Sequence, residues 1–244
     1  MLTILYEDEQ IIVAWKPVGM ESQSSRGFGA DMVSEIRKHI HKLSPKTGAP
    51  YVGVIHRLDK PVSGVMVYAK DKKAAAVLSK QVAENKMKKK YLAVACGKIV
   101  HNVDNFVDYL LKDEKLNVSR IVDKGVTGGK RAELICRKLE NIVDESYGEL
   151  TLAEIELMTG RHHQIRVQMS GHGFPLWGDN KYNPMFADST SRTRADVALA
   201  SYQLTFAHPT TGRSMTFEHL PESMIFKKFS WIRNEGENNR QNNG

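Results

Sequence analysis

One carboxylate stands among three basic side chains in the segment from His56 to Gly64, His-Arg-Leu-Asp-Lys-Pro-Val-Ser-Gly. Two interpretations of Asp59 are open. An aspartate at such a place most often caps its own backbone in a solvated turn. Alternatively, the cationic neighbours keep the carboxylate ionised, and Asp59 acts as a nucleophile. The segment therefore predicts either an ordinary polar turn or a nucleophilic site.

A second polar cluster runs from Thr159 to Gln168, Thr-Gly-Arg-His-His-Gln-Ile-Arg-Val-Gln. Either Thr159 or Gly160 is expected to cap a short helix. Arg161 and His162 then fall in the first turn of that helix, and Arg166 lies one turn further on.

Histidines in this region raise the possibility of a metal site. His162 and His163 are adjacent, and His172 follows nine residues later. Zinc sites need further ligands at short spacing, and no cysteine or carboxylate lies at that spacing here. We therefore expect these rings to make structural hydrogen bonds and expect no metal.

A basic run, Lys86-Met87-Lys88-Lys89-Lys90, comes directly before Tyr91. Such a run is often only a solvated loop. It also fits phosphate contacts beside a buried aromatic ring, because lysines that neutralise phosphates supply most of the affinity for nucleic acid. Both interpretations remain open from the residues alone.

Short strands and two amphipathic helices must position these clusters. Apolar periodicity predicts helices at Ala30–Lys42 and Lys72–Glu84. Alternating or short apolar runs predict strands at Thr3–Tyr6, Ile11–Trp15, Tyr51–Ile55, Gly64–Ala69, Tyr91–Cys96, Asn105–Leu111, Arg131–Arg137, Leu150–Leu157, Val197–Phe206 and Ser214–Phe217. Many strands with few helices between them indicate an α+β fold around a mixed, mainly antiparallel sheet with flanking helices.

Composition narrows the class of protein. The 244 residues are 41% hydrophobic and 26% charged, with a net charge of +7, which favours a globular chain with a polyanionic partner. The apolar runs are far shorter than a membrane-spanning helix, and the N-terminus has no signal-peptide pattern, so we expect a cytoplasmic protein without a membrane. The two cysteines, Cys96 and Cys136, are expected to be buried free thiols.

Together these motifs resemble the RluA family of RNA pseudouridine synthases. The resemblance rests on residues in order from about 4 to about 220: Lys16-Pro17 with Gly19, His56-Arg57-Leu58-Asp59 with Ser63-Gly64, Lys90-Tyr91-Leu92-Ala93, Thr159-Gly160-Arg161, His163-Gln164-Ile165-Arg166, Gly173, Pro175, Gly178-Asp179, Tyr182, His208-Pro209 and Thr211-Gly212. Agreement of several long motifs makes the resemblance specific.

The resemblance implies a catalytic fold with a central RNA-binding cleft. It also implies that Asp59 is the nucleophile, that Tyr91 packs on the target base and serves as the base, and that Arg166 pairs with the aspartate. Arg57 is implied to fill the space left by a flipped uridine. We expect one catalytic domain over residues 1–235, a disordered tail over 236–244, and no accessory RNA-binding domain ahead of the catalytic one.

Further residues of the matched motifs are expected to bind substrate together with Arg57: His56, Lys90, Arg161, His163, Gln164 and Ile165. Three positions depart from the family pattern. His162 stands where relatives often have Ser or Thr, Gln168 where many have His, and Leu134 where a Thr is common. None of the three removes a catalytic group, so the departures concern substrate contacts.

The predicted function is isomerisation of specific uridines to pseudouridine in structured tRNA or rRNA. The reaction needs no cofactor, because it involves neither redox chemistry nor phosphoryl transfer. Asp59 can add covalently to the sugar or the base, or take a proton from the sugar, and the sequence leaves these routes open. RNA is the expected partner, with no obligate protein partner. The alternatives are a non-catalytic RNA-binding module on the same fold and a metal-dependent nucleic-acid hydrolase.

Overall fold

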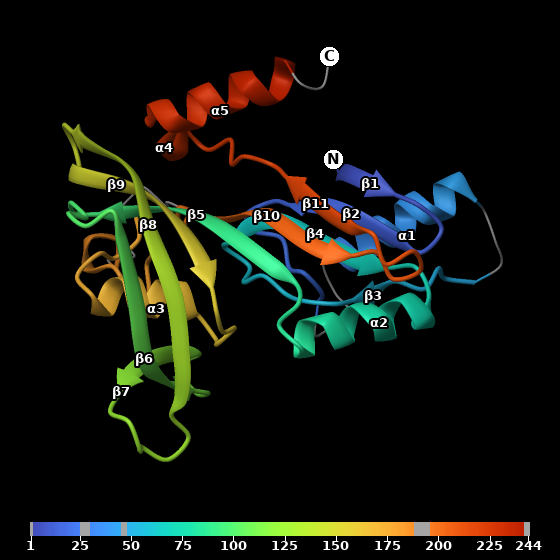
Figure 1. Cartoon of the computed structure of the whole chain (residues 1–244), viewed down its shortest axis with the longest axis horizontal. Coiled ribbons are helices and arrows are strands. Elements are labelled where there is room, and N and C mark those ends of the chain that lie inside the picture. Colours follow the sequence, from blue (N-terminus) through green and yellow to red (C-terminus); the bar gives the residue numbers. More distant parts are fainter. Residues whose placement is uncertain (1, 25–29, 45–47, 188–195, 242–244) are drawn as a thin grey trace. The chain divides into compact units, whose positions relative to one another are not determined.

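Two compact units make up the protein. The computed structural model describes residues 2–24, 30–44, 48–187 and 196–241 (Figure 1). Unit 1 comprises Met1–Lys89 and Ser201–His219, and unit 2 comprises Lys90–Ala200 and Leu220–Gly244. The chain passes between the units within strands β5 (Lys88–Cys96) and β10 (Leu199–Ala207). That residues 1–235 form a single catalytic domain stays a prediction.

Unit 1 is built on a sheet with strand order β1 (Thr3–Glu7), β2 (Ile11–Lys16), β4 (Ser63–Ala69) and β10. The short β3 (Gly53–Val54) pairs with β4, and β11 (Ser214–Glu218) pairs with β10. Strand β4 is buried along its whole length. One cluster of apolar side chains joins strands β2, β4 and β10 to helix α2 (Lys72–Ala83), through residues that include Val13, Val67, Leu78 and Leu204.

Both helices of unit 1 begin at an aspartate. Asp31 caps α1 (Met32–Leu43) by accepting a hydrogen bond from the Ser34 N–H, and Asp71 caps α2 by accepting one from the Ala74 N–H. Each carboxylate satisfies a backbone donor that has no partner inside the helix. The predicted helices at Ala30–Lys42 and Lys72–Glu84 are therefore confirmed to within two residues at each end.

Gly64 allows two strands of unit 1 to approach closely. A Cβ at this position would lie 2.5 to 2.8 Å from the side chain and backbone of Ser201, and the backbone φ is +154°. Any larger residue would push β4 away from β10 directly after the turn that carries Asp59. The glycine is required by both space and conformation.

Unit 2 is a sheet with strand order β5, β9 (Gly148–Leu157), β8 (Lys130–Asp144), β6 (Val103–Asp113) and β7 (Val118–Val122). Every pairing in this order is antiparallel. Strand β7 was not expected from the sequence, because it is only five residues long. The predicted α+β class with a mainly antiparallel sheet is confirmed in both units.

Helix α3 (Gln164–Gly171) covers one face of the unit 2 sheet. Val167 packs with Leu110 and Ala132, and the Gln168 side-chain amide donates to the backbone oxygen of Phe106 at 3.2 Å. Strand register places Tyr91 on the same face. Tyr91 is opposite Ile155, and Ile155 is opposite Cys136. Cys136 shares a face of β8 with Leu134 and Ala132, because every second side chain of a strand points to the same side. The face carrying α3 therefore also carries Tyr91.

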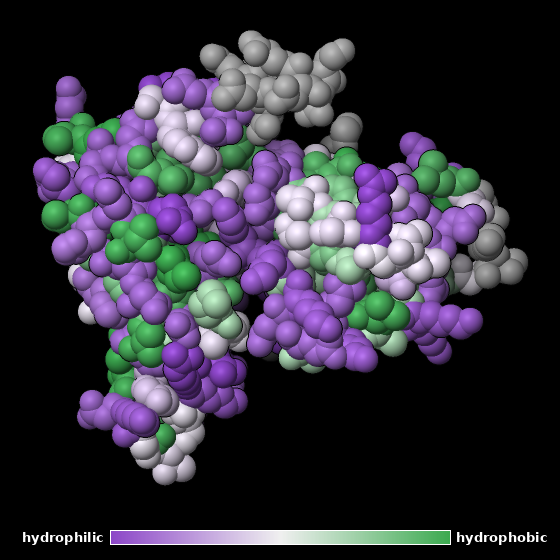
Figure 2. Space-filling model, viewed as in Figure 1, coloured by the Kyte–Doolittle hydropathy of each residue, from purple (hydrophilic) through white to green (hydrophobic). Residues whose placement is uncertain are grey.

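The opposite face of this sheet is more polar. Lys90 and Arg137 point to this face, where both contact the carboxylate of Glu154. Val103 and Val107 are exposed on it, at 49% and 45%. Figure 2 shows hydrophilic residues mixed with apolar ones over the strands of unit 2.

The C-terminal part of unit 2 is helical, with α4 (Met224–Lys227) and α5 (Ser230–Gln241). Glu140 of β8 accepts hydrogen bonds from the backbone N–H groups of Ser230 and Trp231, at 3.2 and 2.9 Å. This carboxylate caps the first turn and stabilises the helix start. Residues 236–241, expected in a disordered tail, continue α5; residues 242–244 lie outside the described part.

Cys96 and Cys136 are buried and free, as predicted. Burial raises the pKa of the Cys136 thiol to about 12, so it stays protonated. No helix among the described residues is long and apolar enough to cross a membrane.

Candidate active site

Asp59 lies half-buried in a turn of unit 1 that enters β4. The backbone oxygen of Asp59 accepts the N–H of Val62 at 3.0 Å, which closes the turn. The backbone oxygen of the next residue, Lys60, accepts the N–H of Gly19 at 2.9 Å. The turn is thus tied to the segment that follows β2.

Lys16 strengthens this tie from below the surface. Its side chain is fully buried, and its ammonium donates to the backbone oxygens of Pro17, Met20 and Lys60 at 3.1, 2.7 and 3.2 Å. All three protons therefore have acceptors. Burial lowers the pKa of Lys16 to about 8, and the nearby carboxylate of Asp59 opposes this shift. The ammonium and Asp59 are close enough to interact electrostatically.

Two neighbours of Asp59 that we expected to bind substrate differ in exposure. Arg57 is exposed. His56 is buried; its Nε2 accepts the Val67 N–H at 3.4 Å, and burial, with a smaller effect of Lys89, lowers the pKa of the ring well below its usual value. His56 is therefore a neutral part of the turn's support, whereas Arg57 is available at the surface.

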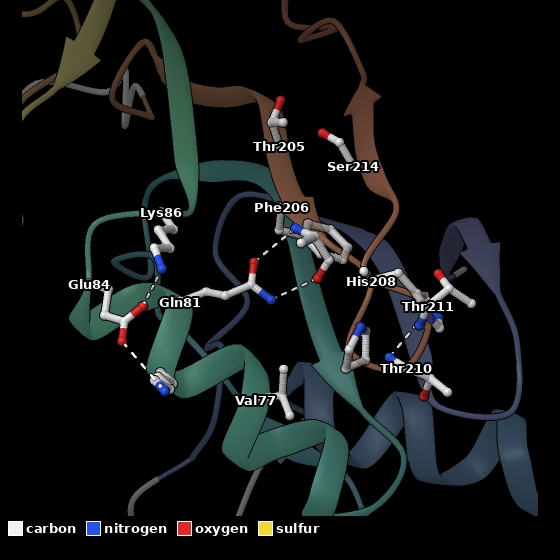
Figure 3. Close-up of a pocket in the computed structure, with 14 residues that line it drawn as sticks. Val77, Gln81, Glu84, Lys86, Thr205, Phe206, His208, Thr210, Thr211 and Ser214 are labelled. Atoms are coloured by element: carbon white, nitrogen blue, oxygen red, sulfur yellow. Dashed lines mark hydrogen bonds and ion pairs between the residues drawn. The ribbon is translucent and has the colours of Figure 1, made fainter.

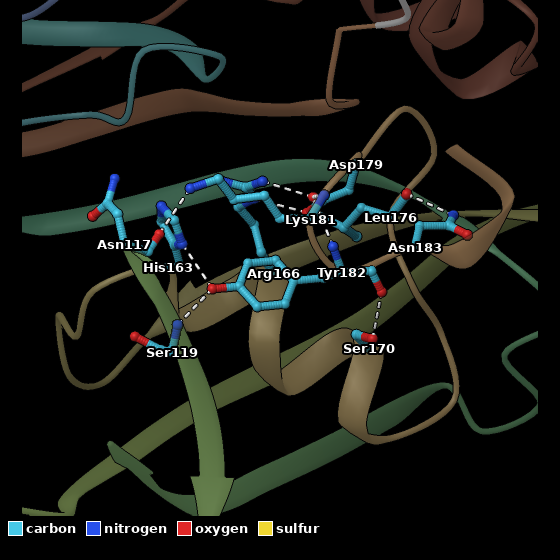
Figure 4. Close-up of polar contacts among 10 residues, drawn as sticks. All are labelled: Asn117, Ser119, His163, Arg166, Ser170, Leu176, Asp179, Lys181, Tyr182 and Asn183. Carbon is cyan, nitrogen blue, oxygen red and sulfur yellow. Dashed lines mark hydrogen bonds and ion pairs between the residues drawn. The ribbon is translucent and has the colours of Figure 1, made fainter. Parts of the chain in front are cut away.

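Arg166 is held by a buried ion pair in unit 2 (Figure 4). Its Nε and Nη2 donate to the two carboxylate oxygens of Asp179 at 2.7 and 2.6 Å. The two side chains are 3% and 0% exposed. A bidentate pair of this kind fixes the plane of the guanidinium. The pairing of Arg166 with Asp59 that the resemblance implies joins residues of different units and stays a prediction.

Tyr182 supports the same guanidinium from its ring face. The Arg166 Cζ lies 5.1 Å from the ring centroid, within the range of a cation–π contact. The Tyr182 hydroxyl accepts the Ser119 N–H and bonds to the Nδ1 of His163, both at 2.7 Å (Figure 4). Strand β7 is thereby bonded, through Ser119, to the tyrosine that contacts Arg166.

His163 is a buried, neutral histidine that bonds to Tyr182. It is 8% exposed, and its backbone is left-handed, with φ of 54°. Burial, followed by the positive charges of Arg166 and other neighbours, lowers the pKa of the ring from 6.5 to about 2. The ring is therefore neutral, and its Nδ1 and the Tyr182 hydroxyl share one hydrogen bond.

The start of α3 differs from the prediction. We expected a cap at Thr159 or Gly160, but the helix begins at Gln164 after a cap residue at His163. The reason is the Gln164 side chain, whose Oε1 accepts from the Thr159 hydroxyl and the Arg161 N–H at 2.8 and 2.9 Å. These bonds hold residues 159–163 in a turn, so Arg161 precedes the helix.

The other predicted substrate contacts fall into two groups. Gln164 and Ile165 are buried, and the Gln164 Nε2 donates to the backbone oxygen of Glu133 at 3.0 Å. Arg161 is exposed, with its Nε donating to the backbone oxygen of Arg131 at 2.9 Å. Lys90 lies on the face of β5 opposite Tyr91, because successive side chains of a strand alternate. Substrate contact by these residues stays a prediction.

A cavity of about 620 Å³ lies in unit 1 between α2 and the connection from β10 to β11 (Figure 3). The Gln81 amide spans it, donating to the Ala207 backbone oxygen and accepting the Ala207 N–H, at 2.7 and 2.8 Å. His208 accepts the N–H groups of Thr210 and Thr211 at Nδ1, so its Nε2 donates to Asp8. Among its described lining residues, none is a predicted catalytic or substrate-binding residue.

Metal ligation finds no support within the described residues, where no group of three or more His, Cys, Asp or Glu side chains is arranged to hold an ion. His162 bonds through Nδ1 to the Ser119 hydroxyl at 2.9 Å, and His172 lies 3.0 Å from the carboxylate of Asp108. Both rings thus have structural hydrogen bonds, as expected.

Sequence reasoning missed the residues that support the predicted catalytic groups. Asp179 and Tyr182 belong to the quoted motifs but had no assigned role, and Ser22 and Ser119 drew no attention. The motif residues Gly178-Asp179 and Tyr182 were the available signals. The other partners are distant in sequence, and only folding reveals them.

Comparisons with known proteins identify the family of this chain. Residues 10–171 match the family model described as RNA pseudouridylate synthase. An uncharacterized RNA pseudouridine synthase of Bacillus subtilis is 37% identical over 229 residues, which cover 91% of this chain and 70% of that protein. Ribosomal large subunit pseudouridine synthase C of Salmonella typhimurium is 30% identical over 236 residues, covering 95% and 70% respectively.

A solved structure, human RNA pseudouridylate synthase domain containing 4, has the same fold. Its TM-score is 0.75 at 20% identity, and the match covers 95% of this chain and 93% of that one. The family match spans more than half of the chain, and the bacterial relatives extend it over nearly all of it. The chain therefore belongs to the RluA-type family of RNA pseudouridine synthases, which are isomerases.

Proposed function

We propose that this enzyme isomerises specific uridines in the RNA of the large ribosomal subunit. The observation that carries this choice of RNA is the match to the Salmonella enzyme, whose name refers to that subunit, over 95% of the present chain. The Bacillus and Salmonella relatives are bacterial proteins, and bacteria make ribosomal RNA in the cytoplasm. The enzyme is therefore proposed to act in the cytoplasm. A tRNA substrate is the competing outcome of the test below.

The reaction breaks the bond between C1′ of the ribose and N1 of uracil, rotates the base, and joins C5 to C1′. The proton on C5 then leaves. Atoms and electrons balance without any oxidant, reductant or phosphoryl donor. The groups required are a carboxylate that engages the sugar or the base, and a base that collects the C5 proton.

Asp59 is the proposed carboxylate. Support comes from its place in a turn that has backbone bonds on both sides, and from the buried ammonium of Lys16 nearby. A positive charge near a carboxyl group favours its ionised form, which is the nucleophilic one. A fixed turn reduces the orientational freedom that must be lost on reaching the transition state.

Tyr91 and Arg166 are the proposed base and partner of Asp59. Tyr91 is 6% exposed and lies on the same face of the unit 2 sheet as α3, which carries Arg166. The ion pair with Asp179 engages Nε and Nη2 of Arg166 and fixes the plane of the guanidinium. This supports a guanidinium that is held in one orientation.

Arg57 is proposed to replace the flipped uridine in the RNA stack. Its exposure, two residues before Asp59, supports this role. Extrusion of a stacked base costs a few kcal/mol, and a planar guanidinium can recover part of that by stacking. Arg161, which is also exposed, is proposed to contact the RNA directly, whereas buried His163 and Gln164 act by shaping the turn before α3.

The test compares pseudouridine maps of ribosomal and transfer RNA from cells with the gene, without it, and with Asp59→Asn in its place. We expect one or more large-subunit positions to lose pseudouridine in the second and third strains. RNA binding by Asp59→Asn should stay within about tenfold, because phosphate contacts supply most of the affinity. Loss confined to tRNA would overturn the proposed substrate, and normal modification by Asp59→Asn would overturn the proposed nucleophile.

A further inference from the structure

Ser22 holds both backbone groups of the residue that precedes Asp59. Its hydroxyl oxygen accepts the Leu58 N–H at 3.0 Å and donates to the Leu58 carbonyl oxygen at 2.9 Å. Ser22 is 4% exposed, and Leu58 is 8% exposed. One buried side chain thus satisfies a donor and an acceptor that water does not reach.

The residue on the other side of Asp59 is held by the same segment. The Lys60 carbonyl oxygen accepts from the Gly19 N–H and from the Lys16 ammonium, at 2.9 and 3.2 Å. Asp59 is therefore flanked by two anchored residues, and both anchors come from residues 16–22. A shift of either anchor would move the Cα of Asp59 and with it the side chain.

We infer that Ser22 is a positioning residue that sets the direction of the Asp59 carboxylate by clamping Leu58. The inference rests on the proposed nucleophilic role of Asp59. Without the hydroxyl, the Leu58 N–H and carbonyl both lose their partner, and the turn has to move to find new ones. A displacement of about 1 Å at a reacting group can cost on the order of 100-fold in rate.

Unit 2 contains a matched control. The hydroxyl of Thr151, which is fully buried, accepts the Ile99 N–H at 3.0 Å and donates to the Gly97 carbonyl oxygen at 2.8 Å. Each of the two hydroxyls has one further acceptor nearby, Met66 Sδ at 3.6 Å for Ser22 and Asn141 Oδ1 at 2.8 Å for Thr151. The turn held by Thr151 carries no predicted catalytic residue, so Thr151→Val removes the same kind of clamp without touching Asp59.

The experiment uses the full-length protein and RNA labelled with tritium at uracil C5, taken from a strain that lacks the gene. Tritium release under single-turnover conditions measures loss of the C5 proton. We expect Ser22→Ala to lower the maximal rate about 10- to 100-fold while the Kd for the RNA changes less than about threefold. Ser22→Thr, which keeps the hydroxyl, should restore most of the rate, and Thr151→Val should react at the wild-type rate.

Thermal unfolding of all four proteins separates positioning from stability. Ser22→Ala and Thr151→Val are expected to lose similar Tm, so only a positioning role predicts different rates for them. Equal rates for Ser22→Ala and wild type would overturn the inference, as would an equal rate loss in Thr151→Val. If Asp59→Asn also releases tritium normally, the proposed nucleophile itself fails. Failure of Ser22→Ala alone leaves that proposal standing.

Discussion

The turn that carries Asp59 and the helix that carries Arg166 are held in place by different forces. The Asp59 turn is held by hydrogen bonds to the backbone groups of Leu58 and Lys60, and its charged donor, the Lys16 ammonium, bonds to backbone oxygens rather than to a carboxylate. Arg166 is instead held by a buried ion pair with Asp179. The first region depends on a hydroxyl and on backbone geometry, and the second depends on charge.

This difference predicts different failures. Loss of a neutral clamp leaves a donor and an acceptor unsatisfied, and a small shift of the turn can satisfy both again at some cost in position. Loss of one partner of a buried ion pair leaves a charge that no small movement returns to water. We therefore expect changes near Asp59 to reduce activity more than stability, and changes near Arg166 to reduce both.

The largest effect on stability is expected for Asp179→Ala, which leaves the buried guanidinium of Arg166 without its carboxylate. The free energy of unfolding should fall by about 3 to 5 kcal/mol, as measured by urea denaturation at pH 7. Glu35→Ala, which breaks the pair of Glu35 with the exposed Lys38, is the control and should cost less than about 1 kcal/mol. Equal losses in the two variants would mean that the Arg166 pair adds nothing beyond a surface contact.

Gly64→Ala tests whether the close approach of β4 to β10, next to the Asp59 turn, is rigid. The new Cβ would meet the backbone of Ser201 below 3 Å, and φ is positive. Overpacking and backbone strain together should cost about 3 kcal/mol in urea denaturation. Gly148→Ala has a positive φ of 72° with open space around it, so it should lose only the conformational part, about 1 kcal/mol. A loss in Gly64→Ala no greater than that would show that β4 and β10 separate easily.

Tyr182→Phe removes the hydroxyl that bonds to Ser119 and His163 but keeps the ring over Arg166. The expected loss is about 2 kcal/mol, because buried polar groups lose a partner. Tyr182→Leu should lose more, since it also removes the cation–π contact. The order of the two variants in Tm is the measurement, and a reversed order would contradict the role given to the ring.

The smallest predicted effect is on pH dependence. The pKa of His163 is about 2 in the folded protein, against the usual 6.5 that applies to the unfolded chain. Below pH 6.5 the unfolded chain therefore binds a proton that the folded protein does not bind. Stability must therefore fall as pH falls through this range. Between pH 7.0 and 5.5 the wild type should lose about 1 kcal/mol more than His163→Asn.

Asparagine is the chosen replacement for His163 because it tolerates the left-handed backbone. Urea denaturation of both proteins at the two pH values provides the comparison. If the free energy of unfolding falls equally in the two proteins, the ring titrates normally when folded. The Arg166 region would then depend less on charge than we infer.

The sequence by itself determined the fold class, the family and most elements. Apolar periodicity is local, and capping residues such as Asp31 and Asp71 mark helix starts within a few positions, so both helices of unit 1 were predictable. Motif spacing identified the family because several long segments agree. The short strand β7 and helix α5 were missed, since pairing with β6 and capping by Glu140 stabilise them more than local pattern does.

Only the tertiary structure decided which side chains support the predicted catalytic groups. Ser22 bonds to a residue 36 positions away, and Ser119 to one 63 positions away. The start of α3 was also decided by long-range contacts, because the Gln164 amide bonds back to Glu133 on β8 as well as to its own turn. A hydrogen bond needs its donor and acceptor within about 3 Å of each other. For residues far apart in sequence, that distance is set only when the sheets form.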